Sequence, residues 1–150
     1  MPEPIVIAVR GYDPKPQGSK VHVGNGHMIE SCREVKHWRH AVTIAAVRQG
    51  VTPLSGEVAM TAEYILSRPK GHFGTGKNAS KLKPSAPYYV GVKPDLSKIQ
   101  RSTEDALTKV AYTDDAKIVS MVLVKRYAAV GELPGAVLTV AQAPDPSDIQ

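Results

Sequence analysis

The chain has 150 residues, 42% of them hydrophobic and 5% aromatic, and it carries a formal net charge of +5 with a sequence pI near 9.4. A chain of this length is expected to fold as one domain, residues 1–150, that buries a core of its own. Its apolar runs are too short to cross a bilayer, its first residues lack the basic charge of a signal peptide, and its single cysteine, Cys32, excludes an intrachain disulfide. We therefore expect a soluble intracellular protein with no membrane partner.

The first part of the chain is expected to form a strand and a hairpin. Residues Ile5–Arg10 alternate and are mostly apolar, which predicts the first strand. Two short β-prone runs, Lys20–Val23 and His27–Glu30, then flank the sequence Gly24-Asn25-Gly26. Asn-Gly between two such runs is the strongest local hairpin signal, because both residue types tolerate the positive φ of a tight turn.

A capped helix is predicted after the hairpin. Ser31 and Glu34 form a capping box, and Gly50 is expected to end the helix. The predicted buried face consists of Val35, Trp38, Val42, Ala45 and Ala46. His37 and His40 have a spacing that zinc sites use, but no second cluster completes a coordination sphere. We therefore assign no metal to this helix.

A long strand and a long basic loop occupy the middle of the chain. Glu57–Ser67 alternates and predicts a strand. The apolar face of this strand consists of Val58, Met60, Ala62, Tyr64 and Leu66. Residues 68–92 indicate a loop rich in Gly, Pro, Ser and Lys, and loops of this length are often functional or mobile. Within it Gly71–Lys77 resembles a P-loop, but Asn78 replaces the magnesium-binding Ser or Thr and Pro84 interrupts the helix that should follow. No nucleotide cofactor is therefore expected.

The next predicted helix has one apolar and one charged face. Its core-facing residues are Leu96, Ile99, Thr103, Ala106, Leu107 and Val110. Lys98, Arg101, Glu104 and Asp105 fall on the opposite face, toward solvent or a ligand. Asp95 lies at the helix start, where free amide groups and the helix dipole favour a carboxylate.

Two more strands complete the predicted fold. Asp114 and Asp115 precede Ile118–Val124, an apolar run that predicts a buried strand, and Gly135–Ala141 predicts the last strand. The polar tail, residues 143–150, is expected to fray. This order of elements predicts a single α+β domain in which a mixed or antiparallel sheet carries both main helices on one face.

The positive charge of the chain is concentrated in one segment. From Arg68 to Lys93 there are six basic residues and no acidic one, which accounts for the whole excess. A basic loop near carboxylates favours a polyanionic substrate such as nucleic acid, although a loop that merely aids solubility has the same composition. Lys15 and Lys20 either extend this surface or discourage edge-to-edge strand pairing. The candidate DNA-binding residues are Lys15, Lys20, Arg68, Lys70, Lys77, Lys81, Lys83, Lys93 and Lys98.

Asp95 and Asp115 are the candidate catalytic carboxylates. A helix start and a strand start could bring them together as a magnesium site for phosphodiester hydrolysis, with Asp114 as a third ligand. Arg101 or Lys98, on the polar helix face, could bind the scissile phosphate or stabilise the transition state. The alternative is structural, with Asp95 as a helix N-cap, the two later aspartates as turn residues, and Arg101 as an ion-pair partner of Asp105.

The stretch KPDLSKIQRSTEDALTKVAYTDDAKIV, residues 93–119, resembles the central motif of the RusA family of Holliday-junction resolvases. The family pattern is D-L-D, a helix with a basic residue, D-A-L, and then D-D followed by Ala or Ser. The resemblance extends to PQGSK before the hairpin, to the capped helix with Trp38 and to the loop SRPKGHFGTGKNA, which are similar to actinobacterial or phage members. It covers nearly the whole chain.

The resemblance implies a small α+β homodimer in the bacterial cytoplasm, encoded by the cell or by a phage or prophage. It implies binding of four-way DNA junctions and paired nicks made with Mg²⁺ or Mn²⁺, in recombination, repair or phage DNA processing. The essential carboxylates of the family correspond to Asp95 and Asp115, and its basic helix residue corresponds to Arg101, where other members have lysine. A two-fold dimer suits symmetric incision, which needs two symmetry-related sites.

One position departs from the family pattern. The second aspartate of D-L-D is Ser97 in this sequence. A hydroxyl does not replace the charge of a carboxylate, so this branch either uses another ligand or has weakened or lost its nuclease activity. The alternative function is therefore a junction- or DNA-binding protein of the same fold with little or no catalysis.

Overall fold

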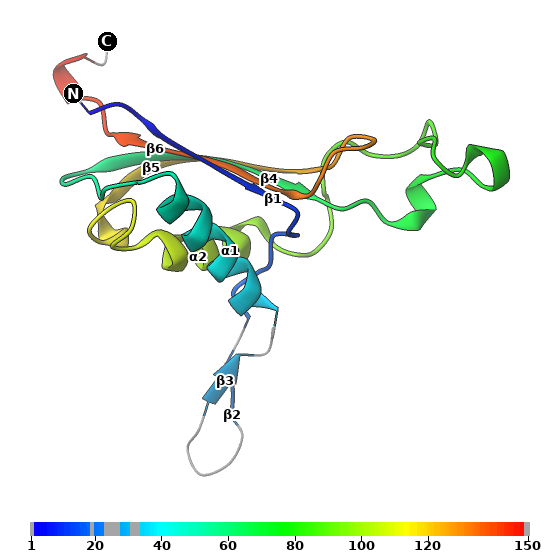
Figure 1. Ribbon diagram of the computed structural model, residues 1–150, viewed down its shortest axis with the longest axis horizontal. Helices are drawn as coiled ribbons and strands as arrows, with labels where there is room; N and C mark the ends of the chain where they lie inside the picture. Colours follow the sequence, from blue (N-terminus) through cyan, green and yellow to red (C-terminus); the bar gives the residue numbers. More distant parts are fainter. Residues whose placement is uncertain (1, 19, 23–27, 31–33, 149–150) are drawn as a thin grey trace.

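Two helices lie on one face of a four-stranded mixed sheet in the computed structural model, which describes residues 2–18, 20–22, 28–30 and 34–148 (Figure 1). The sheet has the order β1-β6-β4-β5, with β4 and β5 parallel and the other pairs antiparallel. Its strands are β1 (Ile5–Arg10), β4 (Val58–Leu66), β5 (Ile118–Tyr127) and β6 (Gly135–Gln142). The helices are α1 (Val35–Arg48) and α2 (Leu96–Leu107). This architecture confirms the predicted α+β class.

The predicted hairpin is present as a separate two-stranded sheet of β2 (Lys20–His22) and β3 (Met28–Glu30). Its turn, and Ser31 of the predicted capping box, lie outside the described residues. Glu34 itself occupies the N-cap position of α1, and Gly50 follows the helix end with a φ of 69°. The glycine thus has the left-handed conformation expected just after a helix.

The core lies between the helices and the sheet. Val58, Met60, Ala62, Tyr64 and Leu66 are buried on the face of β4 that the alternation predicts. A buried hydrogen bond joins the two helices, in which Trp38 Nε1 donates to Thr103 Oγ1 at 3.2 Å. Because α2 packs on α1 and also hydrogen-bonds to β4 through Gln100, the position of α2 is fixed from two sides.

Two polar residues of α2, Gln100 and Ser102, are also buried, which the apolar periodicity did not predict. Tyr64 donates its hydroxyl hydrogen to Gln100 Oε1, and Gln100 Nε2 donates to Met60 Sδ at 3.2 Å. Ser102 Oγ donates to Lys15 O at 2.6 Å. These side chains are buried because segments distant in sequence cover the flanks of α2, so each polar group has a partner there.

The prediction that Ile118–Val124 is a buried strand was wrong. The strand is present as the first part of β5, but β5 lies at the sheet edge, and Val119, Met121 and Val122 are 58%, 49% and 61% exposed. A continuous apolar run is typical of a strand covered on both sides, whereas the outer side of this strand has no neighbour over these residues within the described part of the chain.

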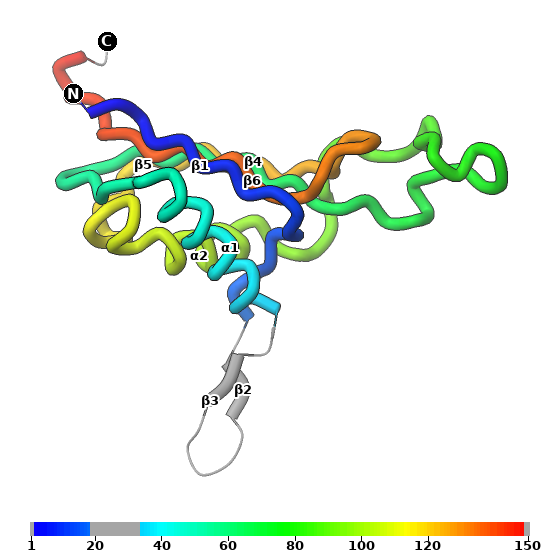
Figure 2. The backbone as a smooth tube through the Cα atoms, viewed as in Figure 1, coloured from blue at the N-terminus to red at the C-terminus, as the bar shows by residue number. Residues whose placement is uncertain are grey.

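Residues 68–92, hereafter the arm, extend away from the end of the sheet (Figure 2). The arm is ordered by turns, with 3₁₀ segments at Lys70–His72 and Gly76–Asn78. Gly74 N donates to Lys81 O at 3.0 Å, which folds the tip back on itself. No α-helix follows the P-loop-like glycines in the arm, where Pro84 was expected to interrupt one.

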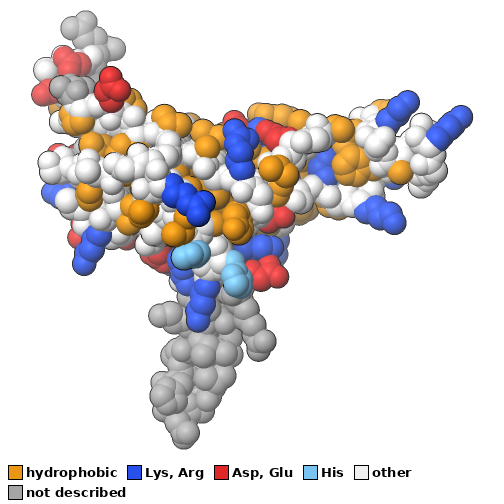
Figure 3. Space-filling view, in the orientation of Figure 1, with side chains coloured by type: hydrophobic (Ala, Val, Ile, Leu, Met, Phe, Trp, Pro, Cys, Tyr) orange, Lys and Arg blue, Asp and Glu red, His pale blue; other side chains and the backbone are white. Residues whose placement is uncertain are grey.

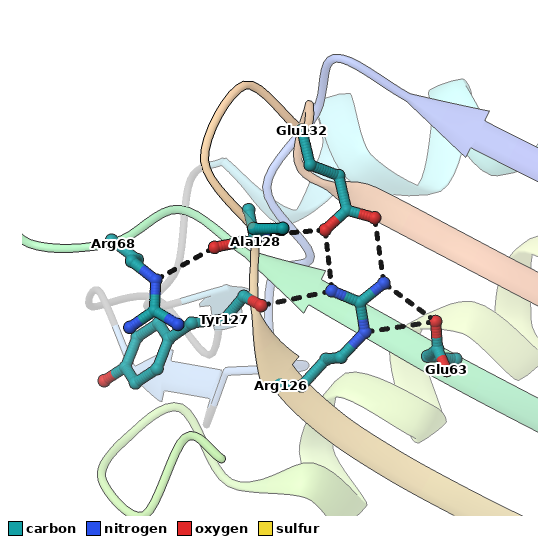
Figure 4. A network of polar contacts seen from close by, with 7 residues as sticks. Glu63, Arg68, Arg126, Tyr127, Ala128 and Glu132 are labelled. Atoms are coloured by element: carbon teal, nitrogen blue, oxygen red, sulfur yellow. Dashed lines mark hydrogen bonds and ion pairs between the residues drawn. The ribbon is translucent and has the colours of Figure 1, made fainter. Parts of the chain in front are cut away.

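Two arginines make polar contacts near the base of the arm, Arg68 from the arm itself and Arg126 from β5 (Figure 4). Arg68 Nε donates to Ala128 O at 2.9 Å, and its guanidinium lies 5.2 Å from the centre of the Tyr127 ring. Arg126 donates to both carboxylate oxygens of Glu132, at 2.6 and 2.8 Å, and to Glu63 at 3.0 Å. These contacts fix the turn between β5 and β6 beside the arm.

We expect Glu132→Gln to lower the free energy of unfolding at pH 7 by about 1–2 kcal/mol, because it removes charge-assisted hydrogen bonds. Hydrogen bonds from Arg126 and from the Ala129 amide lower the pKa of Glu132 to about 2. A carboxylate whose pKa is lower in the folded state stabilises that state above its unfolded pKa of about 4.3, and the contribution is lost as the pH falls toward 2.

Urea unfolding of the wild type and Glu132→Gln at pH 7 and pH 3 measures this effect. The difference in stability should shrink at pH 3, and an equal difference at both pH values would contradict the assignment. Glu3→Gln is the matched control, because Glu3 is exposed and precedes β1.

Candidate functional site

Asp95 lies at the start of α2 and lines a hollow, and its carboxylate is not used for capping. It occupies the N-cap position, but its side chain accepts no capping hydrogen bond. Its carboxylate is half exposed and lies 3.7 Å from Lys98 Nζ. A cavity of about 410 Å³ adjoins it. The charged residues that line this cavity are Asp13, Lys15, Glu34, Lys93, Asp95 and Lys98.

Lys15 reaches this hollow because the segment before the hairpin is bonded to α2 and β4. The Asp13 carboxylate accepts hydrogen bonds from the amide and the hydroxyl of Ser67, both at 2.8 Å. Gln17 N donates to Lys98 O at 2.9 Å. Lys15 Nζ then forms a 2.9 Å ion pair with Glu34, and this lysine lowers the pKa of the Glu34 carboxyl.

The approach to Asp95 is held by the end of β5. Lys125 Nζ donates to Val92 O at 2.7 Å and to Pro94 O at 2.8 Å. Val90 N donates to Lys125 O at 3.3 Å, so the last residues of the arm run along the outer edge of this strand. Lys125 therefore positions Asp95, and the only signal for this role in the sequence was a pair of basic residues, Lys125 and Arg126, at the end of an apolar strand.

Asp114 and Asp115 lie in an exposed 3₁₀ turn before β5, as the structural alternative expected. The Asp114 carboxylate accepts a hydrogen bond from Ala116 N at 2.9 Å, which lowers the pKa of Asp114. The interaction with Asp114 raises the pKa of Asp115. In this turn the Asp114 carboxylate is therefore bonded to the backbone, and the Asp115 carboxylate lies beside the like charge of Asp114.

The structure does not bring Asp95 and Asp115 together within one chain. The charge of Asp115 acts on Glu104, near the end of α2, whereas Asp95 precedes its first residue. The charge of Asp105 also acts on Asp115. Asp105 follows Asp95 by ten positions, which span about 15 Å of helix at 1.5 Å per residue. The two carboxylates are apart because α2 and β5 run in opposite directions.

No metal cluster is present in the described part of a single chain, in which no three His, Cys, Asp or Glu side chains are grouped to hold an ion. Burial raises the pKa of the Glu104 carboxyl, and the negative charges of Asp115 and Asp105 raise it further. Asp105 forms an ion pair with Arg39, at 3.7 Å, whereas the structural alternative expected Arg101 as its partner. Arg101 is exposed on α2, at a position along the helix between Asp95 and Asp105.

The predicted DNA-binding residues fall into two groups. Lys70, Lys77, Lys81 and Lys83 are exposed on the arm, where basic side chains project from its far end (Figure 3). Lys15, Lys93 and Lys98 surround the hollow at Asp95. Arg68 is held at the base of the arm, where it also donates to Pro87 O at 2.7 Å. The side chain of Lys20 lies outside the described residues.

Tyr88 and Tyr89 form an exposed aromatic pair that sequence reasoning missed. The two residues are 56% and 65% exposed. Their rings lie edge to face, with centres 4.8 Å apart. They precede the segment that leads to Asp95. The available signal was two adjacent tyrosines in a chain with few aromatic residues, at the end of the basic loop.

A family model described as endodeoxyribonuclease RusA matches residues 11–140, which include Asp95, Asp115 and the arm. The chain is also similar to the uncharacterized protein YqaN of Bacillus subtilis (strain 168), with 25% identity over 118 residues that cover 75% of this chain and 78% of that protein. Among the described residues, no helix has the length and apolar character needed to span a bilayer.

Proposed function

Because this chain belongs to the RusA family of endodeoxyribonucleases, we propose that it resolves four-way DNA junctions by paired, magnesium- or manganese-dependent nicks. The proposed setting is recombination, repair or phage DNA processing. The observation that supports this proposal most strongly is the match over residues 11–140, since it includes both candidate carboxylates and the basic arm in one family pattern. The net charge of +5 is consistent with a nucleic-acid substrate.

The hollow at Asp95 has the charges that a phosphodiester site needs. Asp95 offers carboxylate oxygens that no capping bond occupies, and Lys93 and Lys98 flank it. Oxygen ligands of this kind suit Mg²⁺, which when bound activates water and neutralises charge on the phosphate. We assign phosphate contact to these lysines and to Arg101, and binding of the cation to Asp95 together with Asp115 and Asp114.

The separation of Asp95 and Asp115 constrains how such a site is assembled. Asp115 lies near Asp105, which is about 15 Å from Asp95 along the axis of α2. Oxygen ligands lie within about 2.1 Å of Mg²⁺, so Asp95 and Asp115 of one chain do not share one ion. We therefore propose that the active form is a homodimer and that each site takes Asp95 from one chain and Asp115 from the other. A two-fold dimer then has two equivalent sites, as paired incision requires.

The arm and the tyrosine pair extend the proposed DNA contact beyond the site. Lys70, Lys77, Lys81 and Lys83 would contact phosphates, which gives affinity without sequence preference. Tyr88 and Tyr89 offer exposed rings next to the site, and such rings stack on unpaired bases. Arg68 is assigned a structural role at the arm base because backbone carbonyls engage its guanidinium.

Incubation with a synthetic four-way junction in Mg²⁺ tests the proposed function. We expect paired nicks in the junction, little cleavage of a linear duplex of the same sequence, and no product in EDTA. Asp95→Asn is expected to lower cleavage at least about 1,000-fold while leaving junction binding intact, since it removes an ion ligand without changing the fold. Glu3→Gln removes the same charge beside β1, at the opposite edge of the sheet from β5, and should retain activity.

The alternative function is junction binding with little or no cleavage, and the replacement of a family carboxylate by Ser97 favours it. Ser97 is exposed in the first turn of α2, two residues after Asp95. The same experiment separates the two functions. Tight binding of the junction without any nicked product in Mg²⁺ or Mn²⁺ would contradict the enzyme and support the binding protein.

A further inference from the structure

A groove lies between α1 and the end of β1, at the edge of the sheet opposite to β5. Its volume is about 470 Å³, and α1 packs against β1 beside it. None of the residues that line it lines the hollow at Asp95 or belongs to the arm. The candidate site therefore does not account for this groove, which is hereafter called the β1 groove.

The α1 side of the β1 groove has an apolar centre with a basic or imidazole side chain at either end. His40, Ile44 and Arg48 follow one another at a spacing of four residues, which places them on one stripe of the helix. Ile44 is half-buried, whereas His40 and Arg48 are exposed. Because the helix rises 1.5 Å per residue, neighbouring side chains of this stripe are about 6 Å apart along its axis.

The charge of the β1 groove is not balanced from within. No carboxylate lines it in the described part of the chain, and there neither Arg10 nor Arg48 is in an ion pair or a side-chain hydrogen bond. Arg39, on the same helix, donates by contrast to Gln17 Oε1 at 2.7 Å. Guanidinium groups without an acceptor favour a ligand that carries carboxylates, which they bind through two parallel hydrogen bonds.

The edge of β1 offers the backbone groups that a further strand needs. Among the described residues β1 pairs with β6 alone, so its outer edge has no strand beside it. Charge or proline commonly blocks such an edge, but β1 has one charged residue, Arg10 at its end, and no proline. An extended peptide adds to an open edge through backbone hydrogen bonds, and alternate side chains give specificity. DNA has no amide groups for this edge, and its phosphates gain nothing from an apolar centre.

We infer that the β1 groove binds an extended acidic segment of a partner protein, which pairs with β1 as an additional strand. Side chains two residues apart on a strand lie about 6.8 Å apart on one face, close to the spacing of the stripe on α1. The segment that fits has an apolar side chain over Ile44 and an acidic side chain two residues to either side. Its carboxylates then meet the basic side chains around the apolar centre.

Titration of the full chain with the peptide Ser-Glu-Thr-Leu-Thr-Glu-Ser, followed through the amide NMR signals, tests this inference. We expect shifts confined to residues 6–10 and 40–49 and a dissociation constant of about 1 mM or tighter. The same peptide with Gln in place of Glu should bind at least about tenfold more weakly. A fully N-methylated peptide should also bind at least about tenfold more weakly, since it has no amide hydrogen to donate to the edge. Equal binding of all three peptides, or no binding of the first at millimolar concentration, would overturn the inference.

A charge reversal assigns the binding to the β1 groove. Arg48→Glu is expected to weaken binding of the acidic peptide at least about tenfold, because it places a like charge beside the carboxylates. Lys36→Glu is the matched control, since Lys36 is exposed on α1 outside the groove, and it should bind within about twofold of the wild type. Equal losses in the two variants would contradict the site.

DNA is the competing occupant, and the same two variants distinguish it. If Arg48→Glu weakens binding of a linear DNA duplex more than Lys36→Glu does, the groove is a nucleic-acid surface and the inference is overturned. The comparison of peptides needs only the wild-type chain, so it decides the matter even if Arg48→Glu fails to fold. None of these measurements uses DNA cleavage, so failure of the proposed endonuclease would leave their outcome unchanged.

Discussion

Mixing the Asp95→Asn chain with the Asp115→Asn chain is expected to restore junction cleavage that neither variant shows alone. If each site takes one carboxylate from each chain, a mixed dimer has one site with both aspartates and one site with neither. With free exchange about half of the dimers are mixed, so about a quarter of all sites are intact. The product should be single nicks, measured on denaturing gels, because each mixed dimer has only one active site.

The reciprocal mixture is the sharpest control for this prediction. A chain with both substitutions, added in excess to the wild type, should suppress cleavage, because every site of such a mixed dimer lacks one aspartate. If both carboxylates acted within one chain, these mixed dimers would keep one intact site and the two single variants would not complement. If mixed dimers of the Asp95→Asn and Asp115→Asn chains form but cleave no junction, the shared site is contradicted.

Replacing Lys77, Lys81 and Lys83 together by Gln is expected to weaken junction binding about 10- to 100-fold near 0.1 M salt. Each phosphate contact contributes about 0.9 to the slope of log K against log salt, so the slope should flatten by about 2 to 3. The lysines are exposed on the arm, so the fold should be unaffected. Titration of a labelled junction at several salt concentrations measures both quantities.

A charge-matched control distinguishes a contact by the arm from a loss of net charge. Arg10, Lys36 and Arg48 are exposed on β1 and α1, outside the arm, and their replacement by Gln removes the same charge. We expect this control to bind nearly as the wild type does. Equal losses in both triple variants, or unchanged affinity of the arm variant, would contradict a role of the arm in DNA binding.

The sequence alone determined most of the elements and the chemistry they present. Period-two alternation placed β1 and the buried face of β4, and helical spacing placed Trp38 and Val42 in the core, because these patterns depend only on local geometry. The charge of the arm and the residue types Asp95 and Asp115 were also evident from the sequence. These features are local, so no knowledge of long-range pairing was needed.

The tertiary structure decided which of these residues share a site. It placed Lys15 beside Asp95 by bonding the segment before the hairpin to Ser102, and it buried Gln100 beneath Tyr64. The apolar run of β5 predicted a buried strand, but strand order, which depends on pairings distant in sequence, set it at the edge. Because α2 runs opposite to β5 (Figure 1), Asp95 and Asp115 lie at opposite ends of the helix, a separation that spacing along the sequence does not reveal.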